Sequence, residues 1–376
     1  MKTVRTIFCN NMAYGGVAYT VWELLENSRG PAFARQLWYI GGDPGVFRDY
    51  HRPAFGNLLW RAAMKVPGSQ DWQRWIVGKL AVRDVRPGDI AYVWPPYSLD
   101  FIRAAKARGA LVVAERINCM GLTAKMALAR AYEHIGRPVP QGLFSQEWLA
   151  EETEQMLACD YVTAPNDFVV KSLLESGVKR ERILETSYGW SPTRLAAAVN
   201  LTRPERPPVF AFVGSGIVRK GLNLLLEAWE LAGVDGQLLI AGRIDEEIRA
   251  VCARQLARPD VCELGFVKDV ASVYAAADIF VFPTLEEGGP QVTYEAAGCA
   301  LPSIVSPMGA GRMVRDGLEG YVIDPYDIEG WARSIRALAH DRALRRRMAD
   351  NAVSRAQEFT WHRVGGRLYE IFERLT

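Results

Sequence analysis

The chain has 376 residues, of which 49% are hydrophobic and 23% charged, a globular composition with enough length for two domains. A net charge of +2 gives no general reason to expect nucleic acid as a partner. The sequence has no apolar run of about 20 residues, the length needed to span a membrane. The N-terminal residues contain too few apolar side chains for a secretory signal. Six scattered cysteines without a Cys-x-x-Cys pair predict reduced, buried thiols. We therefore expect a cytoplasmic protein.

The first half of the chain has the pattern of a doubly wound sheet. A strand at 4–9 is followed by a loop with Gly15 and Gly16 and then by an apolar helical stripe. The loop lacks a Gly-x-Gly-x-x-Gly pattern, so no dinucleotide site is indicated. Further strands are expected at residues 37–40, 89–94, 110–114, 161–164 and 183–187. These elements predict a first Rossmann-like domain over residues 1–190.

Residues 55–82 are rich in tryptophan and basic side chains. Trp72, Trp75, Ile76 and Leu80 share one helical face, with arginine and lysine among them. Such a helix would suit peripheral contact with the inner face of a membrane or a lipid-linked acceptor. The interpretation that we favour is that these aromatic side chains pack into the first domain.

The strand at 110–114 is followed by Glu115 and Arg116. An arginine stays protonated, so Arg116 cannot act as a base, although it could bind a hydroxyl group, a carboxylate or an acceptor. The alternative is a surface ion pair between Arg116 and Glu115.

Residues 191–208 contain four prolines and no periodicity, which predicts an interdomain linker. A second domain is expected over residues 209–358, with strands at 209–213, 237–241, 261–264, 279–282, 304–306 and 321–323 and helices at 222–232 and 328–357. In its first unit, a strand, the loop 214–221 and a helix form a phosphate cradle. Lys220 could neutralise a leaving diphosphate. Arg219 could do the same or be a solvated side chain.

The stretch 283–303 follows the buried strand at 279–282. It contains Glu286 and Glu287, a turn at 288–290, and a helix predicted at 291–299 with Pro290 at its first position. A strand that ends in glycines and opens a helix presents free N–H groups to an anion, and glycine lets a ligand approach the backbone. Seven residues separate Glu287 from Glu295, and each carboxylate could accept bonds from paired hydroxyl groups.

Such a site would bind phosphate between two groups that are rich in hydroxyls, and a nucleotide sugar is a ligand of this kind. The alternative is that Glu295 is a solvated helix residue and that Glu286 or Glu287 merely favours the start of the helix.

This stretch resembles the donor site of the retaining GT-B glycosyltransferases of family 4, the glycosyl transferases group 1. The resemblance rests on Pro283-Thr284, on residues 287–290 and on Glu295-Ala296. It extends over nearly the whole chain and is strongest from about Glu151 onward. It implies an α/β fold of GT-B architecture, with two Rossmann-like doubly wound domains that face an interdomain cleft. It also implies that residues 359–376 form a helix that crosses back to the first domain.

The resemblance implies a role for each predicted site residue. Glu295 would hold the ribose hydroxyls, Glu287 the hydroxyls of the donor sugar, and the cradle residues Lys220, Arg219 and Ser215 the diphosphate. Arg116 would close the site from the first domain. Backbone groups complete the expected donor site, at Gly16, Gly214, Phe266, Val267, Gly288, Gly289, Pro290, Gln291 and Val292. The chain departs from the family pattern in two places, because Ser215 replaces an arginine and Arg116 replaces a histidine.

The expected reaction is transfer of a sugar, with retention, from a nucleotide sugar that we expect to be UDP-linked. The acceptor would be a glycan, a lipid-linked or a small molecule, as in the synthesis of cell-surface polysaccharide or lipopolysaccharide. The chain has no convincing Asp-x-Asp motif, so no metal and no cofactor are expected. The alternatives are a weakly active scaffold subunit that binds nucleotide sugars, or another GT-B enzyme such as an epimerase or a phosphorylase.

Overall fold

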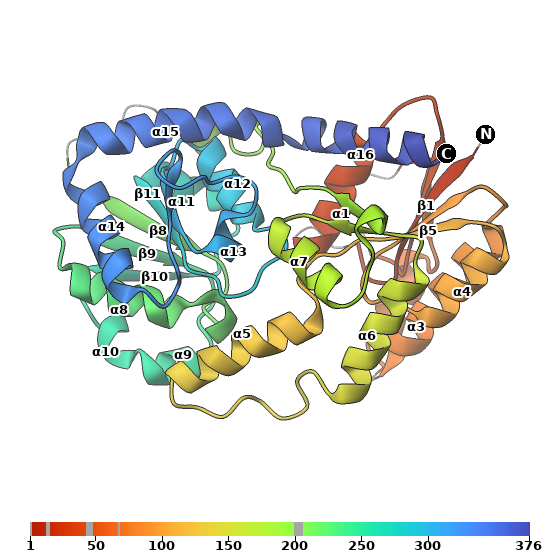
Figure 1. The fold of residues 1–376 in the computed structure, drawn as a ribbon, viewed down its shortest axis with the longest axis horizontal. Coiled ribbons are helices and arrows are strands. Elements are labelled where there is room, and N and C mark those ends of the chain that lie inside the picture. Colours follow the sequence, from red (N-terminus) through yellow and green to blue (C-terminus); the bar gives the residue numbers. More distant parts are fainter. Residues whose placement is uncertain (1, 13–15, 43–47, 67, 199–205) are drawn as a thin grey trace.

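The computed structural model describes residues 2–12, 16–42, 48–66, 68–198 and 206–376. Figure 1 shows two α/β units side by side, joined across the top by long helices. The first sheet has seven parallel strands in the order β3-β2-β1-β4-β5-β6-β7. Their bounds are β1 Thr3–Phe8, β2 Ala34–Tyr39, β3 His51–Pro53, β4 Ile90–Val93, β5 Leu111–Ala114, β6 Tyr161–Ala164 and β7 Ile183–Glu185.

The second sheet has six parallel strands in the order β10-β9-β8-β11-β12-β13. Their bounds are β8 Val209–Val213, β9 Gln237–Ala241, β10 Val261–Gly265, β11 Ile279–Phe282, β12 Ser303–Val305 and β13 Gly320–Val322. In both sheets the strand order reverses beside the first strand, at β1/β4 and at β8/β11. Ligands of doubly wound sheets bind at such switch points, beyond the carboxyl ends of the strands.

Helices cover both sheets, because parallel strands need a crossover after each strand. Around the first sheet lie α1 Gly16–Asn27, α2 Asn57–Ala63, α3 Ser69–Asp84, α4 Leu99–Ala107, α6 Gln146–Ala158 and α7 Asp167–Glu175. Around the second lie α8 Leu222–Ala232, α9 Glu246–Val251, α10 Ala253–Leu256, α11 Val270–Ala276, α12 Gln291–Gly298, α13 Pro307–Ala310, α14 Ile328–His340 and α15 Arg342–Ala356. We refer to these two halves as the first and second domains. Helix α5 Gly121–His134 instead reaches from the first sheet to the second domain, where Leu128, Ala131 and Tyr132 join that domain's core (Figure 1).

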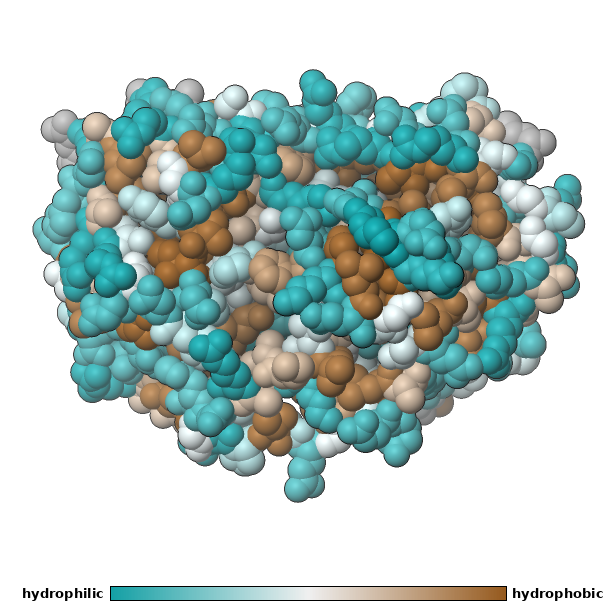
Figure 2. Space-filling model, viewed as in Figure 1, coloured by the Kyte–Doolittle hydropathy of each residue, from teal (hydrophilic) through white to brown (hydrophobic). Residues whose placement is uncertain are grey.

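Helix α16, Trp361–Leu375, follows the second domain in sequence but packs on the first. Its apolar stripe is buried against α1 and the first sheet, with Leu368 and Phe372 in the same core cluster as Val4. Tyr369 stacks on Phe33 with 5.0 Å between the ring centres. Hydrophilic side chains cover the outer sides of α15 and α16, and apolar side chains on this face gather in separate patches (Figure 2).

The predicted α/β fold with two Rossmann-like sheets is confirmed, and strands β6, β8, β9 and β11 have the predicted bounds. The short edge strand β3 was not predicted. All six cysteines lie in the described part of the chain and outside any disulfide, and five of them are buried.

The favoured interpretation of residues 55–82 holds for Trp60, which packs against the core of the first domain, and is wrong for Trp72 and Trp75. The segment forms two helices, α2 and α3, and the buried face of α3 consists of smaller side chains such as Val77 and Ala81. Trp75 is 57% exposed and Trp72 is 43% exposed. Trp72 meets Phe55 edge-on, and Lys79 lies over the ring of Trp75.

The segment predicted as a linker is packed at its beginning. Leu195 and Ala198 are fully buried in the core cluster of the second domain, beside a short 3₁₀ turn at Ala196–Ala198. Residues 199–205 lie outside the described part of the chain. The interdomain connection therefore begins as part of the second domain's core.

Candidate active site between the two domains

A small cavity of about 230 Å³ lies where the two domains face each other. The first domain contributes the start of α1, the loop after β5 and Tyr188; the second contributes the ends of β8 and β11 and the start of α12. Its walls are Gly16, Val17, Thr20, Ile117, Asn118, Tyr188, Val213, Gly214, Lys220, Phe282, Glu287, Gly289, Pro290, Gln291 and Val292. Eight of the predicted donor-site residues are among them.

Lys220 is held by the glycine loop after β8. Gly221 adopts a left-handed conformation with φ 68°, and a Cβ there would lie 2.3 Å from the carbonyl oxygen of Pro283. This close approach places Lys220 against Glu287, with which it forms an ion pair, and both side chains are 13% exposed. Burial, together with the neighbouring Arg219, lowers the pKa of Lys220 to about 7, and Glu286 opposes this shift.

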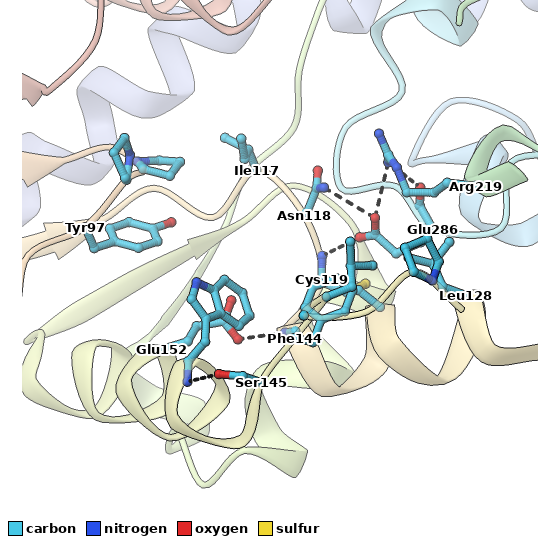
Figure 3. A pocket seen from close by; sticks show the side chains of 18 of the residues that line it. Tyr97, Ile117, Asn118, Cys119, Leu128, Phe144, Ser145, Glu152, Arg219 and Glu286 are labelled. Atoms are coloured by element: carbon cyan, nitrogen blue, oxygen red, sulfur yellow. Dashed lines mark hydrogen bonds and ion pairs between the residues drawn. The ribbon is translucent and has the colours of Figure 1, made fainter. Parts of the chain in front are cut away.

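Glu286 lies at the contact between the domains and was not predicted as a site residue. Its carboxylate is 1% exposed and accepts hydrogen bonds from the backbone N–H of Cys119 at 3.0 Å and from the Asn118 amide at 3.3 Å. Arg219 donates to the carbonyl oxygen of Glu286 at 2.9 Å and to its carboxylate at 3.2 Å. Figure 3 shows these three groups converging on Glu286. The alternative in which Glu286 only favours the start of a helix is wrong.

The glycines of the 288–290 turn allow the domains to approach. A Cβ on Gly288 would lie 2.0 Å from the carbonyl oxygen of Ile117, and one on Gly289 would lie 2.1 Å from the ring of Tyr188. Asn166, which caps α7, also donates its amide to the carbonyl oxygen of Glu287 at 3.0 Å. These glycines are therefore needed first for contact with the other domain, a reason that the sequence did not reveal.

Helix α12 begins at Gln291, as predicted, and ends at Gly298, one residue earlier than predicted; Pro290 does not occupy the first helical position that we expected for it. Pro290 is instead the N-cap of the helix. The first N–H groups of a helix have no partner within it, so this end of α12 brings the positive end of the helix dipole to the cavity wall.

Glu295 lies inside α12, behind Gln291, and is 5% exposed. It pairs with Arg194, and it accepts hydrogen bonds from the Tyr274 hydroxyl and the Gln291 amide, each at 3.0 Å. Burial raises the pKa of Glu295, whereas Arg194 and the two hydrogen bonds lower it. The alternative of a solvated Glu295 is wrong. Arg194, which also lies over the ring of Tyr19, was missed because it belongs to the predicted linker.

Arg116 is buried and does not form the predicted alternative, a surface pair with Glu115. Its guanidinium lies 2.7 Å from the carboxylate of Glu152 and donates to the carbonyl oxygen of Asn118 at 3.0 Å. Glu115 instead accepts from Tyr92 and Tyr188, and burial raises its pKa to about 7.

The remaining predicted residues lie outside the walls of the small cavity. Arg116 and Arg219 line a second, larger cavity. Ser215 is exposed, Phe266 is 73% exposed with Arg243 over its ring, and Val267 is half-buried. Within the described residues, no three His, Cys, Asp or Glu side chains cluster as a metal site would require.

The large cavity has a volume of about 1380 Å³ and lies beside the small one. Three residues, Val17, Ile117 and Asn118, line both. Its other walls come mainly from α5, α6 and the loop between them in the first domain, and from the loop after β8 in the second. Figure 3 looks into this cavity, with Glu152 and Phe144 on one side and Arg219 and Glu286 on the other.

Residues 207–341 match the family model for glycosyl transferases group 1. A D-inositol 3-phosphate glycosyltransferase of Salinispora tropica is 26% identical over 266 residues, which cover 63% of this chain and 54% of that protein. The capsular polysaccharide biosynthesis glycosyltransferase CapM of Staphylococcus aureus is 28% identical over 156 residues, 40% of this chain and 41% of that protein. The chain thus spans about half the length of the curated relatives that it matches.

Among solved structures, Anabaena HepE in complex with UDP and glucose superimposes with a TM-score of 0.70 at 16% identity, over all of both chains. Residues 207–341 are thus similar to the glycosyl transferases group 1, and the structural similarity over the whole chain supports the GT-B fold.

Proposed function

We propose that this chain is a retaining glycosyltransferase of family 4 that moves a sugar from a UDP-linked donor to a carbohydrate or lipid-linked acceptor. One observation carries the proposal. The small cavity holds the ammonium of Lys220, the carboxylate of Glu287 and the start of α12 at the point where the second sheet reverses its strand order, opposite the start of α1 in the first domain. A cation and a helix N-terminus suit a diphosphate, and a carboxylate suits the hydroxyl groups of a sugar.

In this reaction the bond between the anomeric carbon and the diphosphate oxygen breaks. A bond to the acceptor oxygen forms on the same face, and the acceptor's proton passes to the departing diphosphate. Glu287 would orient the sugar, while Lys220 and the N–H groups of Gln291 and Val292 would stabilise the charge of the leaving group. Arg219 would add a second positive charge near the leaving group. Glu295 would bind the ribose hydroxyls once its ion pair with Arg194 is broken. Contact of Gly288 and Gly289 with the first domain would exclude water and limit hydrolysis of the donor.

A thermal-shift screen tests the donor. UDP, GDP, ADP and TDP and their sugars are compared with and without EDTA, because a ligand that binds only the folded state must raise the unfolding midpoint. We expect a shift with UDP and a UDP-sugar that survives EDTA, since we propose that no divalent ion and no cofactor is required, and that disappears in Glu295→Ala. No shift with any of these ligands at millimolar concentration would contradict the proposal.

The stereochemistry has its own test. Proton NMR of the first product formed, before any equilibration, distinguishes retention from inversion by the coupling at the anomeric proton. An inverted product would contradict the retaining assignment while leaving the transferase itself intact.

We also propose that α2 and α3 contact the surface of an anionic membrane from the cytoplasmic side. On α2, Leu58 is 83% exposed and Leu59 is 67% exposed, close in sequence to the basic side chains Arg61 and Lys65, and α3 carries the exposed Trp75. Apolar side chains that enter the headgroup layer beside cations are the pattern of a peripheral helix. No helix in the described part of the chain is long and apolar enough to cross a bilayer.

Cosedimentation with vesicles tests this contact. Binding to vesicles with about 30% phosphatidylglycerol should exceed binding to pure phosphatidylcholine, and the double variant Leu58→Ser/Leu59→Ser should lose it. Equal recovery of wild type and variant with the anionic vesicles at low salt would contradict it.

A further inference from the structure

We infer that the large cavity binds an uncharged oligosaccharide, several sugar units long, as the acceptor, and not a phosphorylated small molecule. The inference rests on the proposed transferase function and narrows its acceptor. Four features of the cavity carry it: its size, its charge, its aromatic side chains and its connection to the small cavity.

The size of the cavity exceeds what a single small molecule needs. Ligand pockets for small molecules usually hold about 300–1,000 Å³. The large cavity, at about 1380 Å³, is above this range and runs between α5, α6 and the second domain. A chain of several sugars would fill such a space, whereas one phosphorylated polyol would leave most of it to water.

The charge of the lining disfavours an anion. The cavity is lined by three arginines and six carboxylates and by no lysine or histidine among the described residues. Each arginine pairs with a carboxylate of the same lining, namely Arg74 with Asp71 at 3.3 Å, Arg116 with Glu152 at 2.7 Å and Arg219 with Glu286 at 3.2 Å.

Three further carboxylates remain, on Glu151, Asp245 and Glu247, so the lining has a formal charge of −3. A phosphate group there would be repelled, whereas carboxylates readily accept bonds from sugar hydroxyl groups.

Aromatic side chains supply the apolar surface on which sugar rings can stack. Trp148 lies in the first turn of α6, is 46% exposed, and meets Phe144 edge-on with 5.4 Å between the ring centres. The Ser145 hydroxyl accepts the backbone N–H of Trp148 at 3.2 Å and so fixes the start of the helix. Tyr97 and Tyr132 also line the cavity. A flat ring with little conformational freedom suits the C–H face of a sugar.

Phe144 is held in an unusual backbone conformation. Its φ is 55°, in the left-handed region that bulky residues rarely adopt. Such strain persists only where the surroundings enforce it and is concentrated at functional sites. Here the Lys125 ammonium donates to the carbonyl oxygen of Phe144 at 3.2 Å, and the ring sits beside Trp148 on the cavity wall.

The two cavities are adjacent, which an acceptor site requires. Val17, Ile117 and Asn118 separate them and line both. An oligosaccharide in the large cavity could therefore present one terminal hydroxyl group to a donor sugar beside Glu287, with its other units extending along α6 toward Trp148.

Binding of neutral tetrasaccharides to the full chain, without donor, tests the inference. Maltotetraose, cellotetraose and chitotetraose are titrated against D-inositol 3-phosphate by saturation-transfer NMR and calorimetry. We expect at least one neutral probe to bind and Trp148→Ala to weaken it about tenfold, in line with a stacking contribution. Trp148→Phe, which keeps an aromatic ring, should lose less affinity for that probe than Trp148→Ala does. Leu157→Ala, on the same helix with 42% exposure but outside the cavity lining, should change nothing.

Two results would overturn the inference: binding of the inositol phosphate with no binding of the neutral probes, or a neutral probe whose affinity is unchanged in Trp148→Ala. UDP-induced thermal shift is measured on the same samples. Loss of the UDP response with sugar binding intact would count against the proposed transferase, whereas an intact UDP response with no sugar binding would count against this acceptor alone. An unchanged UDP response in Trp148→Ala also shows that the variant is folded.

Discussion

The two cavities differ in how their charges are arranged. In the small cavity, Lys220 and Glu287 are paired with each other and largely buried, so a ligand must replace a bond that already exists. In the large cavity the arginines are paired and a surplus of carboxylates remains on the wall. The small cavity therefore favours a ligand whose charges match Lys220 and Glu287. The large cavity favours a ligand that fills its shape and offers hydroxyl groups to its carboxylates. Adjacent spaces with these properties could hold a charged donor and a neutral acceptor without exchanging them.

The largest expected effect is on the charged cavity. Lys220→Ala removes the cation that we assign to the leaving diphosphate, and kcat should fall about 10²–10³-fold, as for loss of one well-placed electrostatic group. Release of UDP in the presence of donor and acceptor measures it. Lys268→Ala, an exposed lysine of the same domain, is the control. If kcat falls by less than about threefold in Lys220→Ala, the small cavity does not depend on its cation, which would contradict the contrast drawn between the two cavities.

Gly288→Ala tests the contact that brings the cavities together. The new methyl group would lie 2.0 Å from a backbone carbonyl oxygen, and overpacking of this kind costs about 1–3 kcal/mol. We expect a lower unfolding midpoint in urea and weaker UDP binding. Gly366→Ala on α16, where a Cβ meets nothing within 4 Å, should be neutral or slightly stabilising. Equal midpoints for the two variants would show that the domains do not depend on this approach.

The affinity for a nucleotide sugar should fall with rising pH. The pKa of Lys220 is lowered to about 7, so its ammonium is charged below that pH and loses its proton above it. UDP-glucose keeps a fully ionised diphosphate over this range, so its Kd should rise by up to about tenfold per pH unit above 7. Lys220→Arg should flatten the profile, because arginine stays protonated. A flat wild-type profile between pH 6 and 9 would contradict this assignment.

The smallest expected effect concerns Arg194. Its pairing with Glu295 must be released before the ribose can use that carboxylate, and a partly exposed ion pair is worth up to about 1 kcal/mol. Arg194→Ala should therefore bind UDP about fivefold more tightly by calorimetry. Arg333→Ala, a surface arginine of the same domain, should leave Kd unchanged. Weaker UDP binding in Arg194→Ala would instead make Arg194 a ligand of the nucleotide.

The sequence predicted the parts of the fold in which the pattern is continuous. Buried parallel strands such as 209–213 and 279–282 are unbroken apolar runs, so their bounds could be predicted. Strand β3 could not, because His51, Arg52 and Pro53 have no apolar pattern and pair only at the sheet edge.

The same holds for the site. Residues 287–292 are contiguous, and most of them line one cavity as expected. Two partners lie more than 100 positions away, Asn118 for Glu286 and Arg194 for Glu295, and nothing in their own sequence surroundings marked them. Tertiary packing also decided that Trp75 lies outside, although its spacing suggested a core face.

Helix α16 has a consequence for the order in which the protein matures on the ribosome. Trp361, Val364, Leu368 and Phe372 are part of the core of the first domain, yet they are translated after the entire second domain. Domains usually complete their folding in the order in which they are synthesised. Here the second domain can finish while the first still exposes the groove beside α1 where α16 will dock. The first domain leaves the ribosome first, yet its apolar surface beside α1 stays uncovered until α16 has been synthesised.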